Sequence, residues 1–388
     1  MSQPLRSSSI SELPTSDAQM RSIRFSLFDA FLYSLMVGAG ESYLPAYSFQ
    51  LGLSEVAVGI LASLPMLSGA TLQMFSMHGL RWLKSHKAWV VAATALQALS
   101  FIPLIALAYV NVASFWSLFF VYTLYWAAGY AAAPAWNYWM SFLLKNQNTT
   151  HYLNRRLRVS QAGVLCGLVG GAVLLKLGTE ITSFHHLFGL LFSFACVARF
   201  LSSWALSRKH FDASWFKKDE TLTVSPWRLW RGLKERQKSF LRKMIPFQIA
   251  LFMSGPYVAP FLLAKRQFSY FEFMMSVVVF FIGKIALSLF LDVRDNFVLK
   301  NPQLHRILFV GGALVVSILP IYWPWAISFT QVLILQAVSG LCYAAFELSL
   351  QQIFFEQLEE KEKVPFLSCY NFISAFGIWF GGMLGEIG

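Results

Sequence analysis

The main constraint on this 388-residue chain is a series of apolar runs, each long enough to cross a bilayer. A helix needs about 20 residues to span a hydrocarbon core of about 30 Å. The first half carries six runs, at roughly 25–48, 54–76, 88–109, 114–143, 158–177 and 185–206. The second half carries five, at roughly 244–264, 270–291, 305–322, 327–354 and 365–387. These runs predict an all-α polytopic membrane protein.

The composition agrees with a membrane protein and indicates how the chain divides. Hydrophobic residues make up 56% and charged residues 13%, against about 25% charged in soluble domains. We expect a polar cytoplasmic N-terminus over 1–24, a six-helix bundle over 25–206, a basic cytoplasmic linker over 207–243 and a five-helix bundle over 244–388. The first apolar run is too long for a signal-peptide core and should remain as a helix. We expect that a twelfth helix is missing from this sequence.

The lysines and arginines set the orientation. A net charge of +12 is a reason to consider nucleic acid, but the placement of the charges favours topology as the cause. With the N-terminus in the cytoplasm, 26 of the 31 Lys and Arg residues fall on the cytoplasmic side, as the positive-inside rule requires. We therefore expect an integral protein of a bacterial cytoplasmic (inner) membrane, monomeric and without a nucleic-acid partner.

Residues 226–243, PWRLWRGLKERQKSFLRK, predict one amphipathic helix within the linker. Pro226 suits a first helical turn. An apolar face would lie on the membrane surface and the basic residues would meet anionic headgroups; that face consists of Trp227, Trp230, Leu233 and Phe240. A binding site for a protein partner is the alternative.

Two loops carry a resemblance to a known family. The segment HGLRWLKSHKAW, between the second and third runs, keeps the basic pair His86-Lys87 but has Trp82 in place of an acid. LFLDVRDNF, after the eighth run, supplies Asp292, Arg294 and Asp295 at the equivalent turn. With two helical halves joined by a long basic loop, the chain resembles the major facilitator superfamily (MFS). The resemblance implies two bundles that rock about a central site in a solute transporter.

Five ionisable residues lie inside expected helices: Asp29, Glu41, Arg199, Lys284 and Glu347. Each costs about 2.5–3.5 kcal/mol at the bilayer centre and should face a partner, the bundle interior or a water-filled cavity. Matching depths predict a Lys284–Glu347 pair and an Asp29–Arg199 pair. Either pair could clamp the helices, close a cytoplasmic gate or bind substrate.

Glu41 lies in the outer half of the first helix, where we find no cation at matching depth apart from Lys176 and Lys265, both near the outer interface. A desolvated carboxyl without a counter-ion tends to hold a proton, which suits proton coupling or recognition of a cationic substrate. The alternative is that Glu41 lies near the outer surface and is hydrated. Small or helix-breaking residues predict bends at corresponding places in the two halves, which points to a binding site; they are Gly38, Gly40 and Pro45, with Gly255, Pro256 and Pro260.

The end of the fourth helix, PAWNYWM, is rich in aromatic residues. Such residues commonly anchor a helix end at the membrane interface. Alternatively, Trp126, Trp136 and Asn137 line a cavity for a large, partly apolar ligand.

The sequence contains no catalytic or cofactor signature. It has no GxxxxGK[ST] loop, and the neighbouring His185 and His186 would point to different helix faces. We expect no enzyme, cofactor or metal site. The sequence favours a secondary active transporter that moves a small organic or amphiphilic solute by alternating access, with proton coupling through Glu41. A non-transporting scaffold or sensor for a cytoplasmic partner, or a lipid or lysolipid flippase, remains open.

Overall fold

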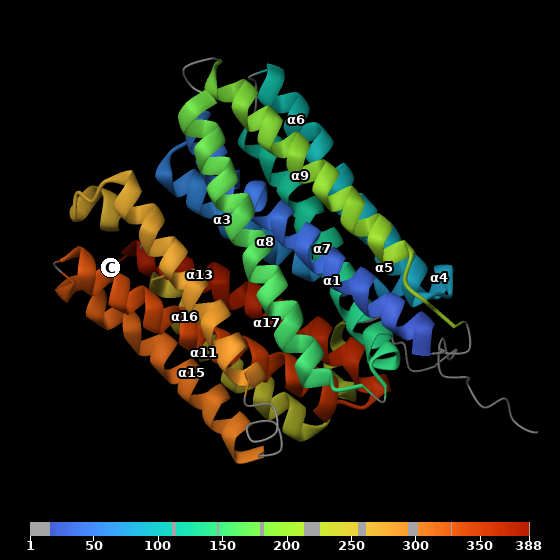
Figure 1. Ribbon diagram of the computed structural model, residues 1–388. Helices are drawn as coiled ribbons and strands as arrows, with labels where there is room; N and C mark the ends of the chain where they lie inside the picture. Colours follow the sequence, from blue (N-terminus) through green and yellow to red (C-terminus); the bar gives the residue numbers. More distant parts are fainter. Residues whose placement is uncertain are drawn as a thin grey trace, which may run out of the picture.

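A computed structural model describes residues 16–110, 114–145, 147–178, 182–212, 226–254, 261–293, 302–326 and 328–387, and within these ranges the secondary structure is helical. Figure 1 shows two groups of helices side by side, one blue to green and one yellow to red. The first group contains α1 (Ser16–Ala39), η1 (Glu41–Tyr43), α2 (Leu44–Gln50), α3 (Glu55–Gln73), α4 (Met77–Leu83), α5 (His86–Leu99), α6 (Phe101–Val110), α7 (Phe115–Leu143), α8 (Thr149–Gly178) and α9 (Phe184–Ser207).

The second group contains α10 (Pro226–Gly232), α11 (Glu235–Ser254), η4 (Phe261–Lys265), α13 (Tyr270–Val293), α15 (Pro302–Tyr322), η5 (Trp323–Trp325), α16 (Phe329–Gln352), η6 (Ile353–Gln357) and α17 (Glu360–Ile387). In the described part of the chain, eight helices are long and apolar enough to cross a membrane. The all-α polytopic membrane fold expected from the apolar runs is confirmed. The domain boundaries remain a prediction.

Serine residues mark where several helices begin. The side chain of Ser54 accepts a hydrogen bond from the Ala57 amide at the start of α3, and Ser85 accepts one from Ala88 at the start of α5. Ser114 and Ser328 form reciprocal capping boxes at α7 and α16. Each hydroxyl satisfies an amide that has no partner within the helix, so the caps set the entry points of the spans.

The first span, predicted as one helix over 25–48, runs from Ser16 to Gln50 with one local change of helix type. It ends as α1 at Ala39, continues as the short 3-10 turn η1, and resumes as α2 at Leu44. Pro45 occupies the first turn of α2, where its missing amide hydrogen costs nothing. Near Gly40 and Pro45, where a bend was expected, the chain changes from α-helix to 3-10 helix and back.

The same helix pairs recur in both groups and meet through glycine. In the first group α1 packs on α8 and α3 on α7; in the second, α11 packs on α17 and α13 on α16. A Cβ on Gly38 of α1 would collide with the Val164 carbonyl of α8, and one on Gly381 of α17 would lie 2.6 Å from the Ile249 carbonyl of α11. Small residues thus let the backbones approach closely, and Gly38 is a packing residue.

The two groups are joined by uncharged hydrogen bonds near one end. Among the described residues, Gln73 Nε2 donates to Ser368 Oγ at 2.9 Å, and Asn371 Nδ2 donates to Gln73 Oε1 at 3.1 Å. The other two bonds are Gln352 to Thr150, at 3.1 Å, and Ser288 to the Asn154 carbonyl, at 2.9 Å. All four lie at helix ends that the positive-inside rule assigns to the cytoplasm.

Residues 226–243 do not form the single amphipathic helix expected. They form α10 and the first turns of α11, separated at Leu233 and Lys234. Leu233 is 5% exposed, and Phe240 packs 5.9 Å from the rings of Phe309 and Phe366. The expected membrane face is wrong for these two residues, because the core of the second group offers them a better apolar contact. Likewise, α8 begins at Thr149 instead of near 158, which places Arg155 and Arg156 on a helix.

We predict that Gly38→Leu lowers the free energy of unfolding by about 1–3 kcal/mol or more, because the new side chain would force α1 away from α8. Gly170→Leu on α8 is the matched control, since a Cβ there meets no atom within 4 Å. Thermal unfolding of both purified variants measures the difference. Equal loss of stability would show that close approach of α1 and α8 is not required.

Candidate functional site

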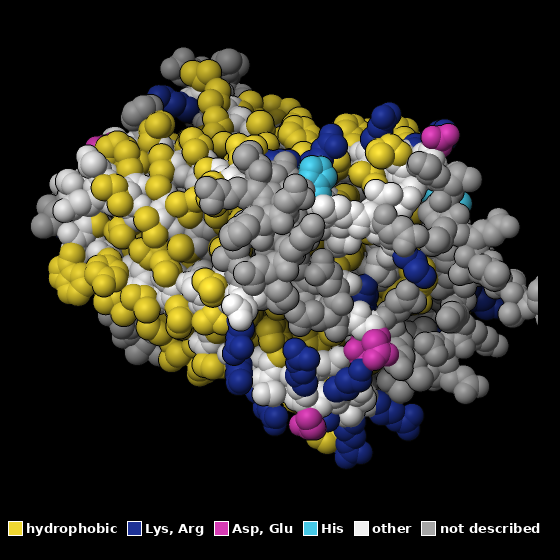
Figure 2. Space-filling view, turned by 60° about the horizontal axis from the view of Figure 1, so that its bottom comes forward, with side chains coloured by type: hydrophobic (Ala, Val, Ile, Leu, Met, Phe, Trp, Pro, Cys, Tyr) yellow, Lys and Arg dark blue, Asp and Glu magenta, His cyan; other side chains and the backbone are white. Residues whose placement is uncertain are grey.

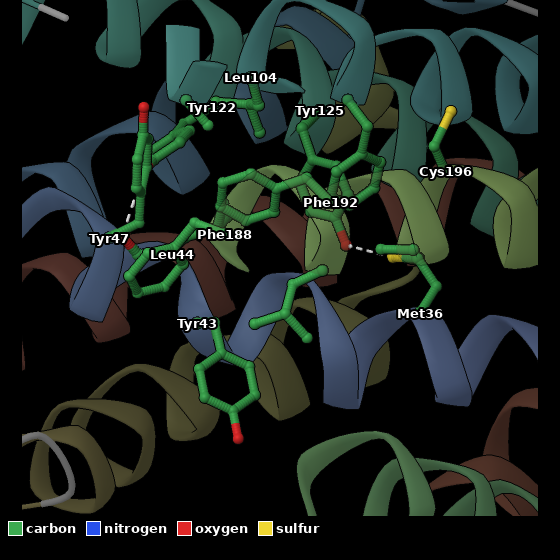
Figure 3. Close-up of a cluster of buried hydrophobic side chains, with 14 of the residues drawn as sticks. Met36, Tyr43, Leu44, Tyr47, Leu104, Tyr122, Tyr125, Phe188, Phe192 and Cys196 are labelled. Atoms are coloured by element: carbon green, nitrogen blue, oxygen red, sulfur yellow. Dashed lines mark hydrogen bonds between the residues drawn. The ribbon is translucent and has the colours of Figure 1, made fainter. Parts of the chain in front are cut away.

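Glu41 begins the 3-10 turn η1 in the first span and contacts Tyr125, a member of a buried aromatic cluster. Tyr125 Oη of α7 donates a hydrogen bond of 2.6 Å to Glu41 Oε2 and also contacts Met36 Sδ at 3.2 Å. Figure 3 shows Tyr125 pointing toward Met36 among rings from α2, α7 and α9. Glu41 itself is partly buried. The 3-10 turn η1 thus places the carboxylate of Glu41 beside the phenol of Tyr125.

Glu41 has no ion pair within the described ranges, where no Lys or Arg nitrogen lies within 4 Å of its carboxylate. Arg199 is the cation whose charge reaches Glu41, but its guanidinium is held elsewhere. Arg199 Nε donates to Gln97 Oε1 at 2.8 Å, and its Cζ lies 4.6 Å from the ring centre of Tyr33. The tyrosine hydroxyl, which the sequence reasoning missed, is the direct partner of Glu41.

The expected Asp29–Arg199 pair is indirect. Ser202 stands between the two: its Oγ accepts from Arg199 Nη1 at 2.8 Å and donates to Asp29 Oδ1 at 2.7 Å. The closer cation is Arg156, whose Nη1 lies 3.6 Å from Asp29 Oδ2. The sequence did not indicate Arg156 as a partner of Asp29, because Arg156 was assigned to a loop, whereas α8 carries it into the bundle.

Lys209 joins this cluster from beyond the end of α9, and nothing in the sequence marked it. Its side chain is 1% exposed, and Nζ lies 4.5 Å from the ring centre of Trp139 and 5.3 Å from that of Trp136. Lys209 Nζ donates a long hydrogen bond of 3.5 Å to Ser26 Oγ. Burial lowers the pKa of Lys209 to about 7, which the charge of Asp29 opposes and that of Arg156 reinforces.

Lys284 and Glu347 form the direct pair expected from their depths. Lys284 Nζ of α13 lies 2.9 Å from Glu347 Oε2 of α16. The lysine side chain is 7% exposed and the glutamate 32%. Lys284 Nζ also lies 5.5 Å from the ring centre of Phe280 and 5.7 Å from that of Tyr343. Whether the pair clamps helices, gates or binds solute remains a prediction.

Tyrosines connect the charged groups of the two halves. The charge of Glu41 reaches Tyr130 of α7, and Tyr130 and Tyr370 of α17 lie close enough to interact electrostatically. The charge of Glu347 in turn reaches Tyr370, which accepts a hydrogen bond of 3.3 Å from Gln248 Nε2. Tyr130 and Tyr370 both keep some accessible surface. The charge of Glu41 therefore acts on Tyr130 from the first bundle, and the charge of Glu347 acts on Tyr370 from the second.

The aromatic residues at the end of α7 do not form one site. Trp126 stacks on Tyr130, 5.6 Å between ring centres. Trp136 packs under Arg156, 4.3 Å from its guanidinium carbon, and meets Phe355 of the other bundle at 6.2 Å. Asn137 donates to the Ala133 carbonyl of its own helix at 2.9 Å. Two or more helical turns separate Trp126 from the others, so only Trp126 joins the central tyrosines.

Several expected residues cannot be placed. Gly255, Pro256 and Pro260, the expected bend of the seventh span, lie outside the described residues, as do Arg294 and Asp295. In the described part of the chain, no group of three or more His, Cys, Asp or Glu side chains could hold a metal ion.

Comparison with solved structures identifies the fold. The sequence matches no protein-family model and no curated protein. The structure is similar to a bacterial homologue of the iron transporter ferroportin in an outward-facing state, with a TM-score of 0.67, 11% identity and coverage of 95% of this chain and 92% of that one. It is also similar to the major facilitator superfamily proton:xylose symporter XylE, with a TM-score of 0.68, 10% identity and coverage of 95% and 88%.

A third similar structure is the human organic anion transporter MFSD10 (TETRAN), with a TM-score of 0.67, 11% identity and coverage of 94% of this chain and 92% of that one. At these identities the likeness shows the fold alone. The chain has an MFS-like fold, as its helix pattern and loops predicted.

A double-mutant cycle tests the Lys284–Glu347 pair. We predict that Lys284→Met and Glu347→Gln each destabilise the protein, and that the double variant loses less than the sum, by about 0.5–3 kcal/mol. Removing one partner leaves the other without its counter-ion in a low-dielectric interior. Thermal unfolding of the four proteins gives the coupling. Strict additivity would show that the contact contributes nothing.

The buried Lys209 should make the free energy of unfolding depend on pH in a definite direction. Its pKa falls from 10.5 to about 7 on folding, so between these values the unfolded chain binds a proton that the folded chain lacks. Stability should therefore rise with pH from about 7 to about 10, by a few kcal/mol at most, since one pKa unit is about 1.4 kcal/mol. Thermal unfolding against pH should show this rise in the wild type and not in Lys209→Met. If the stability of Lys209→Met rose with pH as much as that of the wild type, the rise would not come from Lys209.

Proposed function

We propose that the protein is a secondary active transporter that moves a small organic or amphiphilic solute by alternating access, with Glu41 as the proton-coupling group. The observation that carries the proposal is the position of Glu41: an intramembrane carboxylate at a helix break, beside a phenol and without an ion pair in the described ranges. A carboxylate there can gain and lose a proton without breaking a salt bridge. Ionisable groups inside membranes commonly mark such proton paths.

The contact between the two halves supports alternating access. Neutral hydrogen bonds such as Gln73–Ser368 close the cytoplasmic end. Each contributes about 0.5–1.5 kcal/mol net, because water replaces it when it breaks. A closure made of a few such bonds can open and re-form within one cycle. The arrangement described above is then the conformer whose cytoplasmic end is closed.

The tyrosines between Glu41 and Glu347 are the proposed solute site. Tyr130 and Tyr370 lie on opposite bundles, so a solute held between them senses the motion of one bundle against the other. Phenol rings offer both an apolar face and a hydroxyl. This chemistry suits an organic solute with a ring or acyl portion and a polar group, and Trp126 extends the aromatic surface through Tyr130.

Proton flux tests the coupling role. Liposomes that contain the protein and a pH-sensitive dye are challenged with a panel of organic solutes, and solute entry and internal pH are recorded together. For a solute that the wild type moves with protons, Glu41→Gln should lose proton movement at least tenfold while keeping downhill solute exchange. A glutamine keeps the hydrogen-bonding shape but cannot titrate.

Asp17→Asn is the matched control, since Asp17 is an exposed acid at the start of α1. It should behave as the wild type. Transport by Glu41→Gln that still depends fully on a pH gradient would remove Glu41 from the mechanism. A protein that moves no solute of the panel under any gradient would contradict the transporter itself.

A further inference from the structure

The cytoplasmic segment α10 carries a surface that the transport proposal does not use. Between Pro226 and Lys243 the sequence has seven Lys or Arg residues and one acid, Glu235. Most of these cations are exposed. Figure 2, which brings the bottom of Figure 1 forward, shows Lys and Arg side chains gathered on the lower part of this face with few Asp or Glu among them. The surface has a strong excess of positive charge.

An exposed indole accompanies the charge. Trp227 is 61% exposed, and the guanidinium carbon of Arg231 lies 4.8 Å from its ring centre. Tryptophan beside arginine is typical of segments that lie at the headgroup level of a membrane, where the ring is partly desolvated and the cation meets phosphate. Charge and exposed apolar surface together favour a lipid surface over a purely acidic partner.

The opposite face of α10 is fixed to the closed end of the two bundles. Leu229 is 2% exposed and Leu233 5%, and both belong to an apolar cluster that includes Phe366 of α17 and Met74 at the end of α3. Met74 follows Gln73, whose side chain bonds to Ser368 and Asn371 of α17. The helix therefore packs at the junction where the first bundle meets the second.

Lys234 ties the segment to the start of α17. Its Nζ lies 2.8 Å from Glu359 Oε1 and 2.6 Å from Glu362 Oε1. These hydrogen bonds raise the pKa of Lys234 above its ordinary value. Any force that fixes the height of α10 at the membrane surface thus acts on the end of α17, and so on the contact between α17 and α3.

We propose that α10 and the first turns of α11 bind anionic lipid headgroups of the cytoplasmic leaflet, and that this binding favours the conformer with a closed cytoplasmic end. The lipid phosphates occupy the exposed cations, Arg228, Arg231 and Arg236 among them, while Trp227 enters the headgroup layer. The apolar face of α10 stays on Met74 and α17. Opening the cytoplasmic end would separate α17 from α3 and move α10 away from its position.

Cross-linking across the closed end tests the coupling. Gln73→Cys and Ser368→Cys are introduced after replacement of the four native cysteines, and a short bifunctional thiol reagent joins them when the end is closed. The protein is placed in nanodiscs of phosphatidylcholine alone or with 30% phosphatidylglycerol. We expect cross-linking at least threefold faster with phosphatidylglycerol.

Three variants identify the surface responsible. Arg228→Gln/Arg231→Gln/Arg236→Gln should lose the effect of phosphatidylglycerol. Arg81→Gln/Lys84→Gln, which removes exposed cytoplasmic charge near α4, should keep it. Lys234→Gln should keep lipid binding and lose the effect on cross-linking, because it cuts the tie to Glu359 and Glu362.

Lipid binding is measured by the quenching of tryptophan fluorescence with brominated lipids. The emission of Trp227 is obtained as the difference between the wild type and Trp227→Phe. Brominated phosphatidylglycerol should quench the Trp227 emission more than brominated phosphatidylcholine does. Equal quenching, or equal cross-linking in both lipids, would overturn the lipid site and favour a protein partner on this surface. Both readouts are independent of transport, so their failure is distinct from failure of the proposed function.

Discussion

Charged side chains inside a hydrocarbon layer cannot be hydrated by lipid, and most of the interior of this protein follows from how each one is accommodated. Asp29 accepts a hydrogen bond from Ser202 and forms an ion pair with Arg156, and Lys284 forms an ion pair with Glu347. These contacts fix α1 against α8 and α9, and α13 against α16. Glu41 is treated differently, because it receives one phenolic hydrogen bond. Glu41 has fewer polar contacts than Asp29 or Lys284, so it is the group best suited to the proposed change of protonation state.

The ion pairs also require neighbouring helices to approach closely. This close approach of the backbones places the charged side chains within reach of one another. Gly163 and Gly167 of α8 let α1 approach until a Cβ on either would collide with the carbonyls of Phe31 or Leu35. That approach brings Arg156, on the same helix, to Asp29. In the second half Gly283 and Gly340 do the same for α13 and α16, the helices that carry Lys284 and Glu347. Packing and ion pairing therefore depend on the same helix contacts.

The helical runs and the Lys284–Glu347 contact could be predicted from the sequence because both follow from length and depth along a helix. Other features needed three-dimensional information. Arg156 was misplaced because α8 starts nine residues earlier than its apolar run, and polarity alone cannot tell an amphipathic helical turn from a loop. Lys209 lies just beyond α9, the last span of the first half, so nothing in its sequence neighbourhood marked it as buried. Tyr125 was missed since a tyrosine in an apolar run carries no signal of its partner, which is 84 positions away.

The junction of α3 and α17 also shows how the two bundles meet through neutral polar side chains. Where the superfamily loop places an acid, this chain has Trp82, which is 79% exposed, so that residue supplies no charged latch. The hydrogen bonds between α3 and α17 join the neutral residues Gln73, Ser368 and Asn371, and beside them Met74 and Phe366 belong to one apolar cluster. Neutral amides cost less to desolvate than ions and gain less when they pair. In the proposed transport cycle, polar contacts of this kind would give a smaller energy difference between the open and closed states than ion pairs, so the proposed binding of α10 to lipid headgroups would be enough to shift it.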